Sequence, residues 1–129
     1  MNTTLEHANI TVSDTNATAA WMCDLFGWHI RWQGTAKNGG YTIHVGTEGS
    51  YLAIYTPASP AIPAETRPDG YVTTGWLNHI GVVVDDLAAT EARVKAAGFT
   101  PYNHADYEPG QRFYFDDHDG IEYEVAQYG

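Results

Sequence analysis

The chain has 129 residues, 43% of them hydrophobic, and carries a formal net charge of −10 at pH 7. That length suits one domain, or two tightly joined halves, with a hydrophobic core. The acidity excludes nucleic acid and anionic membranes as partners, because no basic stripe is present to replace their counterions. The same charge favours solubility or, alternatively, the attraction of a cationic ligand.

Cysteine content and hydropathy indicate the compartment. Cys23 is the only cysteine, so an internal disulfide is excluded. No apolar run approaches the roughly 18 residues of a membrane span, and the first residues lack a basic region followed by an apolar one. We therefore expect a soluble, cytoplasmic protein.

The first half of the sequence predicts a β-α-β-β-β unit. Residues 5–12 form an apolar, β-branched run, and residues 15–26 suit a helix that ends at Gly27. Three further strands are expected in this half, separated by turns that contain glycine, at residues 28–33, 41–45 and 51–56.

The second half predicts the same order of elements. Residues 57–76 contain four of the six prolines and Gly70, which favours a connector over a strand. A strand at 77–84 and a helix at 86–97 follow, and Gly98 ends that helix. The last three strands are expected at residues 99–104, 111–116 and 121–127.

The most informative feature is a repeat of about 70 residues, which is too long for a solenoid unit and long enough for a small α/β module. Residues 5–14 read LEHANITVSD, and residues 77–86 read LNHIGVVVDD. In each copy a histidine, His7 or His79, lies early in the strand. The fold class is therefore predicted as α+β, with βαβββ modules at 1–56 and 77–129. Pairing of the modules about a pseudo-twofold axis would bring both histidines together.

Strand alternation assigns the side chains of each module to two faces. His7 and His79 lie opposite the aliphatic residues of their strands, and Glu124 lies opposite Tyr123 and Val125. The aliphatic faces are expected to pack against the helices. The faces with histidine would then line the inner surface of a curved sheet.

These two strands and residues 110–124, GQRFYFDDHDGIEYE, resemble the vicinal-oxygen-chelate superfamily. The last segment is similar to that family's F-Y-F-x-D-P-D-G-x-x-x-E ending, with His118 in place of the usual proline. The superfamily includes glyoxalase I, methylmalonyl-CoA epimerase, extradiol dioxygenases, and fosfomycin- and bleomycin-resistance proteins. The resemblance implies two βαβββ modules that form an open curved-sheet barrel around a divalent metal ion, in a homodimer.

The resemblance also implies the metal ligands. His7 and His79 match the first-strand ligands of the two modules, and Glu124 matches the last-strand carboxylate of the second. The fourth position falls on Ala53, which cannot bind a metal. Two imidazoles and one carboxylate suit Fe(II), and also Mn, Zn or Ni, and leave positions open for a small oxygen-chelating substrate.

Further side chains are candidates for catalysis or substrate binding. Tyr114 matches a tyrosine that faces the ligand in three-ligand relatives; it is a proton donor or, alternatively, a wall aromatic. His44 is a possible acid or base, or a structural histidine. Arg112 could hold a substrate anion or form a surface salt bridge. The remaining candidates for lining the cavity are Asn9, Thr11, Tyr51 and Tyr55.

Three classes of function stay open at this point. The first is a metal-dependent enzyme, for which the three-ligand count favours a dioxygenase-like site over lyase or isomerase chemistry of the glyoxalase and epimerase type. The second is a metal-free, drug-sequestering protein of the bleomycin-resistance kind, which the acidity and the aromatic content also fit. The third is a structural or regulatory module without a ligand.

Overall fold

The computed structural model describes residues 1–63 and 69–129, and the chain forms two compact units, Met1–Ile62 and Pro63–Gly129. The predicted connector at residues 57–76 lies partly outside the described residues. Within the described ranges, no helix is long and apolar enough to cross a membrane.

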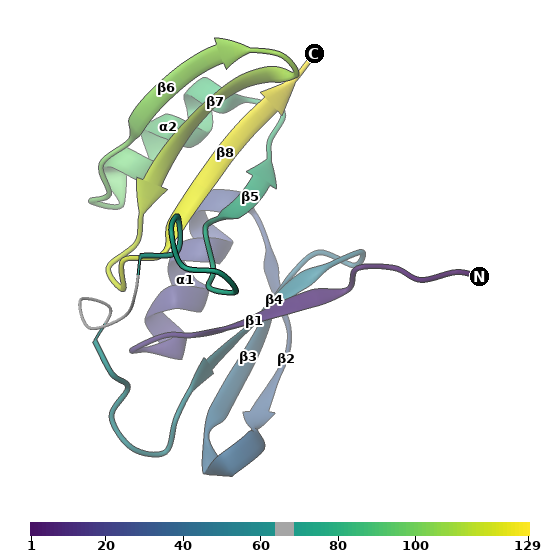
Figure 1. The fold of residues 1–129 in the computed structure, drawn as a ribbon, viewed down its shortest axis with the longest axis vertical. Coiled ribbons are helices and arrows are strands. Elements are labelled where there is room, and N and C mark those ends of the chain that lie inside the picture. The colour runs from purple at the N-terminus through teal and green to yellow at the C-terminus, as the bar shows by residue number, and fades with distance from the viewer. Residues whose placement is uncertain (64–68) are drawn as a thin grey trace. The chain divides into compact units, whose positions relative to one another are not determined.

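The first unit is a βαβββ module built on one mixed sheet (Figure 1). Its strand order is β1-β4-β3-β2, in which β1 and β4 are parallel and the other neighbours are antiparallel. The helix α1 packs mainly against β3 and β4. The elements are β1 (His7–Thr11), α1 (Thr15–Phe26), β2 (His29–Thr35), a short 3-10 turn (Lys37–Gly39), β3 (Tyr41–Gly46) and β4 (Tyr51–Thr56).

The second unit repeats this topology. Its strand order is β5-β8-β7-β6, again with one parallel pair, β5 with β8, and with α2 against the sheet. The elements are β5 (Ile80–Val83), α2 (Leu87–Ala96), β6 (Tyr102–Tyr107), β7 (Gly110–Asp116) and β8 (Glu122–Tyr128). The predicted α+β class and the two βαβββ modules are confirmed, and each sheet is curved (Figure 1).

The aspartate that closes each sequence repeat caps a helix. The backbone N–H of Ala17 donates to Asp14 Oδ1 at 3.1 Å, and that of Ala89 donates to Asp86 Oδ1 at 3.0 Å. These bonds satisfy amides that the first helical turn leaves without partners. Gly27 ends α1 in the left-handed region at φ 67°, where glycine carries no side-chain penalty.

The aliphatic faces form the core of each unit, as the alternation predicted. In the first unit Ile43, Val45 and Ile54 are almost fully buried together with residues of α1. In the second unit Tyr123 and Val125 of β8 are fully buried, and Glu122 and Glu124 point to the other face. Burial of the apolar residues therefore leaves the polar ones of the same strands on one shared surface.

Strands β5 and β6 begin three residues later than predicted. Leu77 to His79 lie outside β5, because their backbone packs against Gly70, where an added Cβ would lie 1.9 Å from the Leu77 carbonyl oxygen. Strand β6 begins at Tyr102 and not at residue 99, since Pro101 cannot donate a hydrogen bond to a neighbouring strand. His79 thus precedes its strand by one residue.

Candidate functional site

In the second unit, two of the predicted metal ligands contact each other. Glu124 lies on β8 beside Gly81 of β5, which brings its side chain close to His79. His79 Nε2 is 3.2 Å from Glu124 Oε1, and the two side chains are 29% and 16% exposed. This nitrogen and this oxygen are therefore half-shielded from water and face each other.

The second oxygen of Glu124 is held by β7. Arg112 Nη1 donates to Oε2 at 2.8 Å, and the Tyr114 hydroxyl donates to the same oxygen at 3.0 Å. Burial on its own would raise the pKa of the Glu124 carboxyl. The hydrogen bonds from Arg112 and Tyr114 and the charge of His79 outweigh it and lower this pKa. The carboxylate is therefore ionised at neutral pH and fixed in orientation.

Tyr114 is a hydrogen-bond donor in this arrangement. Its partial burial, together with its bond to Glu124, raises the pKa of Tyr114 to about 12. The phenol therefore keeps its proton at neutral pH. Its role as a proton source, predicted from the sequence, stays a prediction.

Arg112 forms a shielded ion pair and not the surface salt bridge that the sequence also allowed. Its side chain is 10% exposed, and its guanidinium carbon lies 4.7 Å from the centre of the Tyr107 ring. The pairing with Glu124 follows from register, because Tyr114 lies directly opposite Glu124 and Arg112 lies one step along the same face. The predicted contact of Arg112 with a substrate anion stays a prediction.

The other nitrogen of His79 faces two oxygens. His79 Nδ1 lies 2.6 Å from Asn78 Oδ1 and 3.3 Å from the Tyr71 hydroxyl oxygen. The Tyr71 hydroxyl in turn donates to Glu122 Oε1. Burial and this bond raise the pKa of Tyr71, so that its proton stays in place. Sequence reasoning missed Tyr71, because it lies in the proline-rich segment that was assigned to a connector.

The hydrogen-bonded network continues past Glu122. The Tyr102 hydroxyl contacts Glu122 Oε2 at 2.5 Å and Asp116 Oδ1 at 2.6 Å. Asp116 and Glu122 are cross-strand partners, so the two carboxylates lie side by side on the polar face of the sheet. The polar face of the second unit is thus one connected set of phenols and carboxylates around His79.

In the first unit, the candidate residues gather around Tyr51. Tyr51 lies opposite His7 in the β1–β4 register, and the two rings stack with centres 5.0 Å apart. His44 of β3 also stacks on Tyr51, at 4.6 Å. His7 Nδ1 lies 2.8 Å from Glu6 Oε1, and the His7 side chain is 43% exposed. Three predicted site residues of this module are therefore neighbours.

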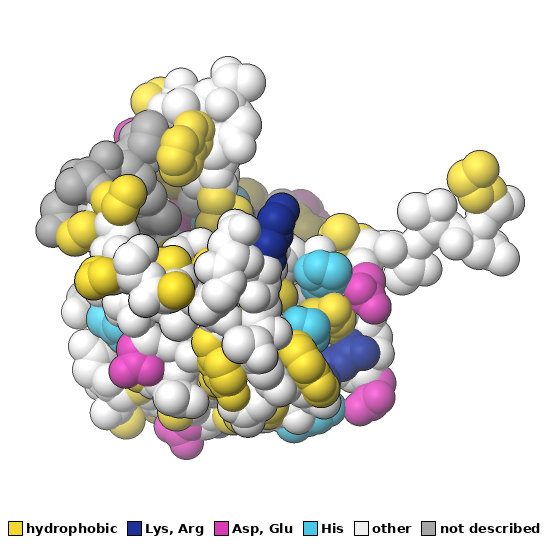
Figure 2. All heavy atoms as spheres, turned by 90° about the horizontal axis from the view of Figure 1, so that it is seen from below, with side chains coloured by type: hydrophobic (Ala, Val, Ile, Leu, Met, Phe, Trp, Pro, Cys, Tyr) yellow, Lys and Arg dark blue, Asp and Glu magenta, His cyan; other side chains and the backbone are white. Residues whose placement is uncertain are grey.

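His44 occupies a more shielded position than His7. Burial, followed by the positive charges of His7 and Arg31, lowers the pKa of the His44 imidazole. His44 is therefore neutral at physiological pH, which is the form that a general base requires. Its cross-strand neighbour is Ala53, which is 2% exposed. Exposed histidine, acidic and basic side chains on one face of the molecule are visible in Figure 2.

The other three predicted lining residues lie on this same face of the sheet. Asn9 and Thr11 are exposed and alternate with buried Ile10. The Tyr55 hydroxyl donates to the backbone oxygen of Lys37 at 2.6 Å, so it is engaged by the 3-10 turn. Their contact with a substrate stays a prediction.

Neither unit, within the described residues, holds a group of three or more His, Cys, Asp or Glu side chains that could bind a metal ion. The predicted triad draws its ligands from both units, so each unit on its own contributes only part of it. The second unit brings two of the three predicted ligands, His79 and Glu124, together.

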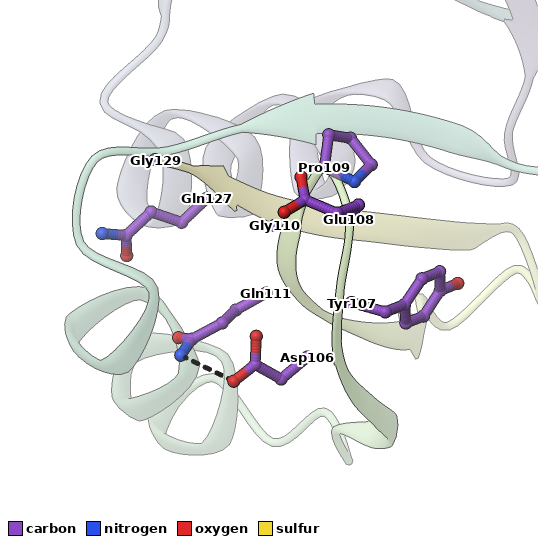
Figure 3. Close-up of a pocket in the computed structure, with 8 residues that line it drawn as sticks. All are labelled: Asp106, Tyr107, Glu108, Pro109, Gly110, Gln111, Gln127 and Gly129. Carbon is purple, nitrogen blue, oxygen red and sulfur yellow. Dashed lines mark hydrogen bonds between the residues drawn. The ribbon is translucent and has the colours of Figure 1, made fainter.

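The structure also has an open cavity of about 610 Å³ at the β6–β7 turn (Figure 3). No predicted site residue lines it. Figure 3 shows Gln111 of β7 turned toward its cross-strand partner Asp106 of β6, to which it is hydrogen-bonded. The lining residues are Asp106, Tyr107, Glu108, Pro109, Gly110, Gln111, Gln127 and Gly129. None of the residues that contact His79 lines the cavity, although Arg112, which binds Glu124, contacts Tyr107 and Gly110 of its lining.

A family model described as the Glyoxalase/Bleomycin resistance protein/Dioxygenase superfamily matches residues 4–125, which include both repeats and most of β8. The chain belongs to this superfamily. The resemblance stated from the histidine-bearing strands and the last motif is thereby confirmed. No curated protein matches the chain in sequence.

Solved structures with this fold include several members of the superfamily. A glyoxylase/bleomycin resistance protein/dioxygenase domain from Frankia sp. EAN1pec is 18% identical, with a TM-score of 0.80 and full coverage of both chains. A variant of the fosfomycin resistance protein FosX from Listeria monocytogenes, complexed with Mn(II) and 1S,2S-dihydroxypropylphosphonic acid, is 21% identical; the match covers 98% of this chain and 93% of that one, with a TM-score of 0.70. The antibiotic binding protein TnmS3 from Streptomyces sp. CB03234 is 16% identical, with coverages of 99% and 98% and a TM-score of 0.71.

The structural neighbours thus include two kinds of protein. One neighbour is complexed with Mn(II) and a small phosphonate, and another binds an antibiotic. At these identities the likeness shows the fold of the chain alone. The choice between the two kinds depends on the chain's own residues.

Proposed function

We propose that this protein is a divalent-metal-dependent enzyme that acts on a small substrate able to chelate the ion through oxygen. The observation that carries the proposal is the approach of His79 Nε2 to Glu124 Oε1 at 3.2 Å. Divalent metals bind imidazole nitrogen and carboxylate oxygen at about 2.0–2.2 Å, so two adjacent ligands of one ion lie about 3 Å apart. His7 is the proposed third ligand, from the same chain or from a second copy in a homodimer.

The surroundings of Glu124 also fit a metal ligand. Arg112 and Tyr114 both bind Oε2 and leave Oε1 directed at His79. Metal-binding carboxylates are commonly held by such hydrogen bonds, which fix the ligand before the ion arrives. On the far side of His79, Nδ1 lies within hydrogen-bond distance of oxygens of Asn78 and Tyr71. A proton on Nδ1 would bind these oxygens and leave a lone pair on Nε2.

The ion and the residues around it would each contribute a different part of the reaction. The ion, when bound, supplies a Lewis acid that polarises an oxygen of the substrate. Tyr114 retains its proton and can share it with a substrate oxygen beside Glu124. His44, neutral at physiological pH, is the proposed acid or base. Two imidazoles and one carboxylate leave room for substrate, which favours dioxygenase-like chemistry over lyase or isomerase chemistry.

One observation favours a second candidate, a metal-free protein that sequesters a cationic compound. Arg112 already places a positive charge 2.8 Å from Glu124, and this charge opposes a divalent cation nearby. The net charge of −10 would attract a cationic ligand in either case. The two candidates differ in whether His79 and Glu124 hold an ion.

The test is elemental analysis of the full chain purified without added metal or chelator. We expect close to one equivalent of Mn, Fe, Zn or Ni in the wild type. The variants His79→Ala, Glu124→Ala and His7→Ala should each lose at least nine tenths of it, because each removes one of three proposed ligands.

A matched control is available in the second unit. His104 Nε2 lies 2.9 Å from Glu91 Oε2, which is the same kind of contact in a more exposed place. The variant His104→Ala should keep the metal. A wild type without metal that binds a cationic drug would contradict the enzyme proposal and favour the sequestering protein. Equal loss in His104→Ala would show that the metal binds the acidic surface at random.

A further inference from the structure

The loop that precedes β5, which the sequence assigned to a connector, holds a side chain beside His79. Asp69 accepts hydrogen bonds from the backbone of this loop: the N–H of Tyr71 binds Asp69 Oδ1 at 2.9 Å and that of Thr73 binds the Asp69 carbonyl at 3.0 Å. Gly70 packs against the Leu77 carbonyl so closely that any side chain would collide with it. The loop is therefore fixed against the segment that leads into His79.

This arrangement puts the Tyr71 ring next to His79. The two rings are nearly parallel, at 20°, with centres 6.3 Å apart, and the Tyr71 oxygen lies 3.3 Å from His79 Nδ1. The hydroxyl of Tyr71 has one proton, and it donates that proton to Glu122 Oε1. The Tyr71 oxygen can then only accept from His79.

Asn78 cannot fix the tautomer of His79 by itself. Its amide has an acceptor oxygen and a donor nitrogen of almost the same shape, so a flip would present either one to Nδ1. In the flipped state the proton of His79 would move to Nε2, where Glu124 Oε1 accepts it. Glu122 lacks this ambiguity, because an ionised carboxylate only accepts.

We propose that Tyr71 and Glu122 are positioning residues that hold the proton of His79 on Nδ1 and so keep Nε2 free. Glu122 orients the Tyr71 hydroxyl, and the Tyr71 oxygen then selects the tautomer of His79. Partners of this kind are known to orient histidine ligands and to change metal affinity when they are removed. The role as a metal ligand rests on the proposed function, whereas the selection of the tautomer does not.

The test is the tautomer of His79, measured by ¹⁵N NMR on the full chain at about pH 8.5, where imidazole is neutral. In the wild type the Nδ1–H form should predominate. Tyr71→Phe keeps the ring and removes the hydroxyl, and Glu122→Gln makes the acceptor ambiguous. Each should lower the ratio of Nδ1–H to Nε2–H by about tenfold. A change of this size corresponds to the loss of one hydrogen bond.

Tyr102→Phe is the matched control, since it removes a phenol from the other oxygen of Glu122 without touching Tyr71. It should leave the ratio unchanged. An Nε2–H majority in the wild type would overturn the proposal, and so would an unchanged ratio in both Tyr71→Phe and Glu122→Gln. Titration of each protein with Mn(II) adds a second readout, in which Tyr71→Phe should bind about 10–100-fold more weakly. A wild type that shows the Nδ1–H tautomer and binds no Mn(II), together with a lowered ratio in Tyr71→Phe, would refute the metal function and uphold the role of Tyr71.

Discussion

Asp117→Ala is expected to lower the free energy of unfolding by about 3 kcal/mol, because three donors lose their acceptor in a buried place. Asp117 is 6% exposed. Its Oδ1 accepts from the backbone N–H of Asp119 at 2.9 Å and of Ile121 at 3.0 Å, and its Oδ2 accepts from the Tyr123 hydroxyl at 3.2 Å. Urea denaturation at pH 7, followed by circular dichroism, measures the change.

The effect of pH on the stability of the fold indicates a control for Asp117→Ala. Burial raises the pKa of the Asp117 carboxyl, although its hydrogen bonds act in the opposite direction. A raised pKa in the folded state means that this group stabilises the fold most when protonated, and that the contribution is lost as pH rises through that pKa. Asp117→Asn resembles the protonated acid, so at pH 7 it should cost about 1 kcal/mol or less. Equal losses in both variants would contradict this account of the turn.

Mn(II) is expected to stabilise the wild type by about 2.7 kcal/mol when its free concentration is 100 times the dissociation constant. The reason is that only the folded chain brings His79 and Glu124 together. Glu124→Ala should abolish the effect, and Glu91→Ala should retain it, since Glu91 pairs with His104 outside the proposed site. The measurement is the unfolding temperature across a Mn(II) titration. Stabilisation that persists in Glu124→Ala would place the ion elsewhere.

The pKa of Glu124 determines how this stabilisation responds to acid. Its pKa lies below that of an ordinary glutamate, so the carboxylate stays ionised at pH values at which an ordinary glutamate begins to protonate. A lowered pKa in the folded state contributes stability above the unfolded value, and this contribution is lost as pH falls through the folded value. Between about pH 5 and 7, protonation of Glu124 should therefore not weaken Mn(II) binding.

The repeated pattern was sufficient to predict the order of the elements, because the signals for a strand, a helix and turns recur in both halves. Gly27 ends α1, as the sequence indicated, and Asp14 and Asp86, the last residues of the two repeated segments, cap the helices that follow. The face assignment also held, since alternation in a half-buried strand leaves Glu124 opposite buried Val125. These features depend on residues that are close along the chain or lie in one sheet, so a sequence pattern can predict them.

The partners of the site side chains were harder to predict. Arg112 was expected to bind a substrate or a surface acid, and it binds Glu124, because a two-residue step along β7 brings it to the same oxygen as Tyr114. Tyr71 could not be found from periodicity, since it lies on a loop among prolines. The close packing of Gly70 against Leu77 brings that loop to His79, and a local sequence pattern does not predict such a contact.

The central claim is that His7, His79 and Glu124 bind one divalent ion. Anomalous diffraction at the manganese edge, from crystals of the full chain grown with Mn(II), tests it most directly. We expect one strong peak within about 2.0–2.3 Å of His79 Nε2, of Glu124 Oε1 and of an imidazole nitrogen of His7 from the same chain or a second copy. A peak at other residues, or these three side chains far apart in every arrangement of subunits, would contradict it.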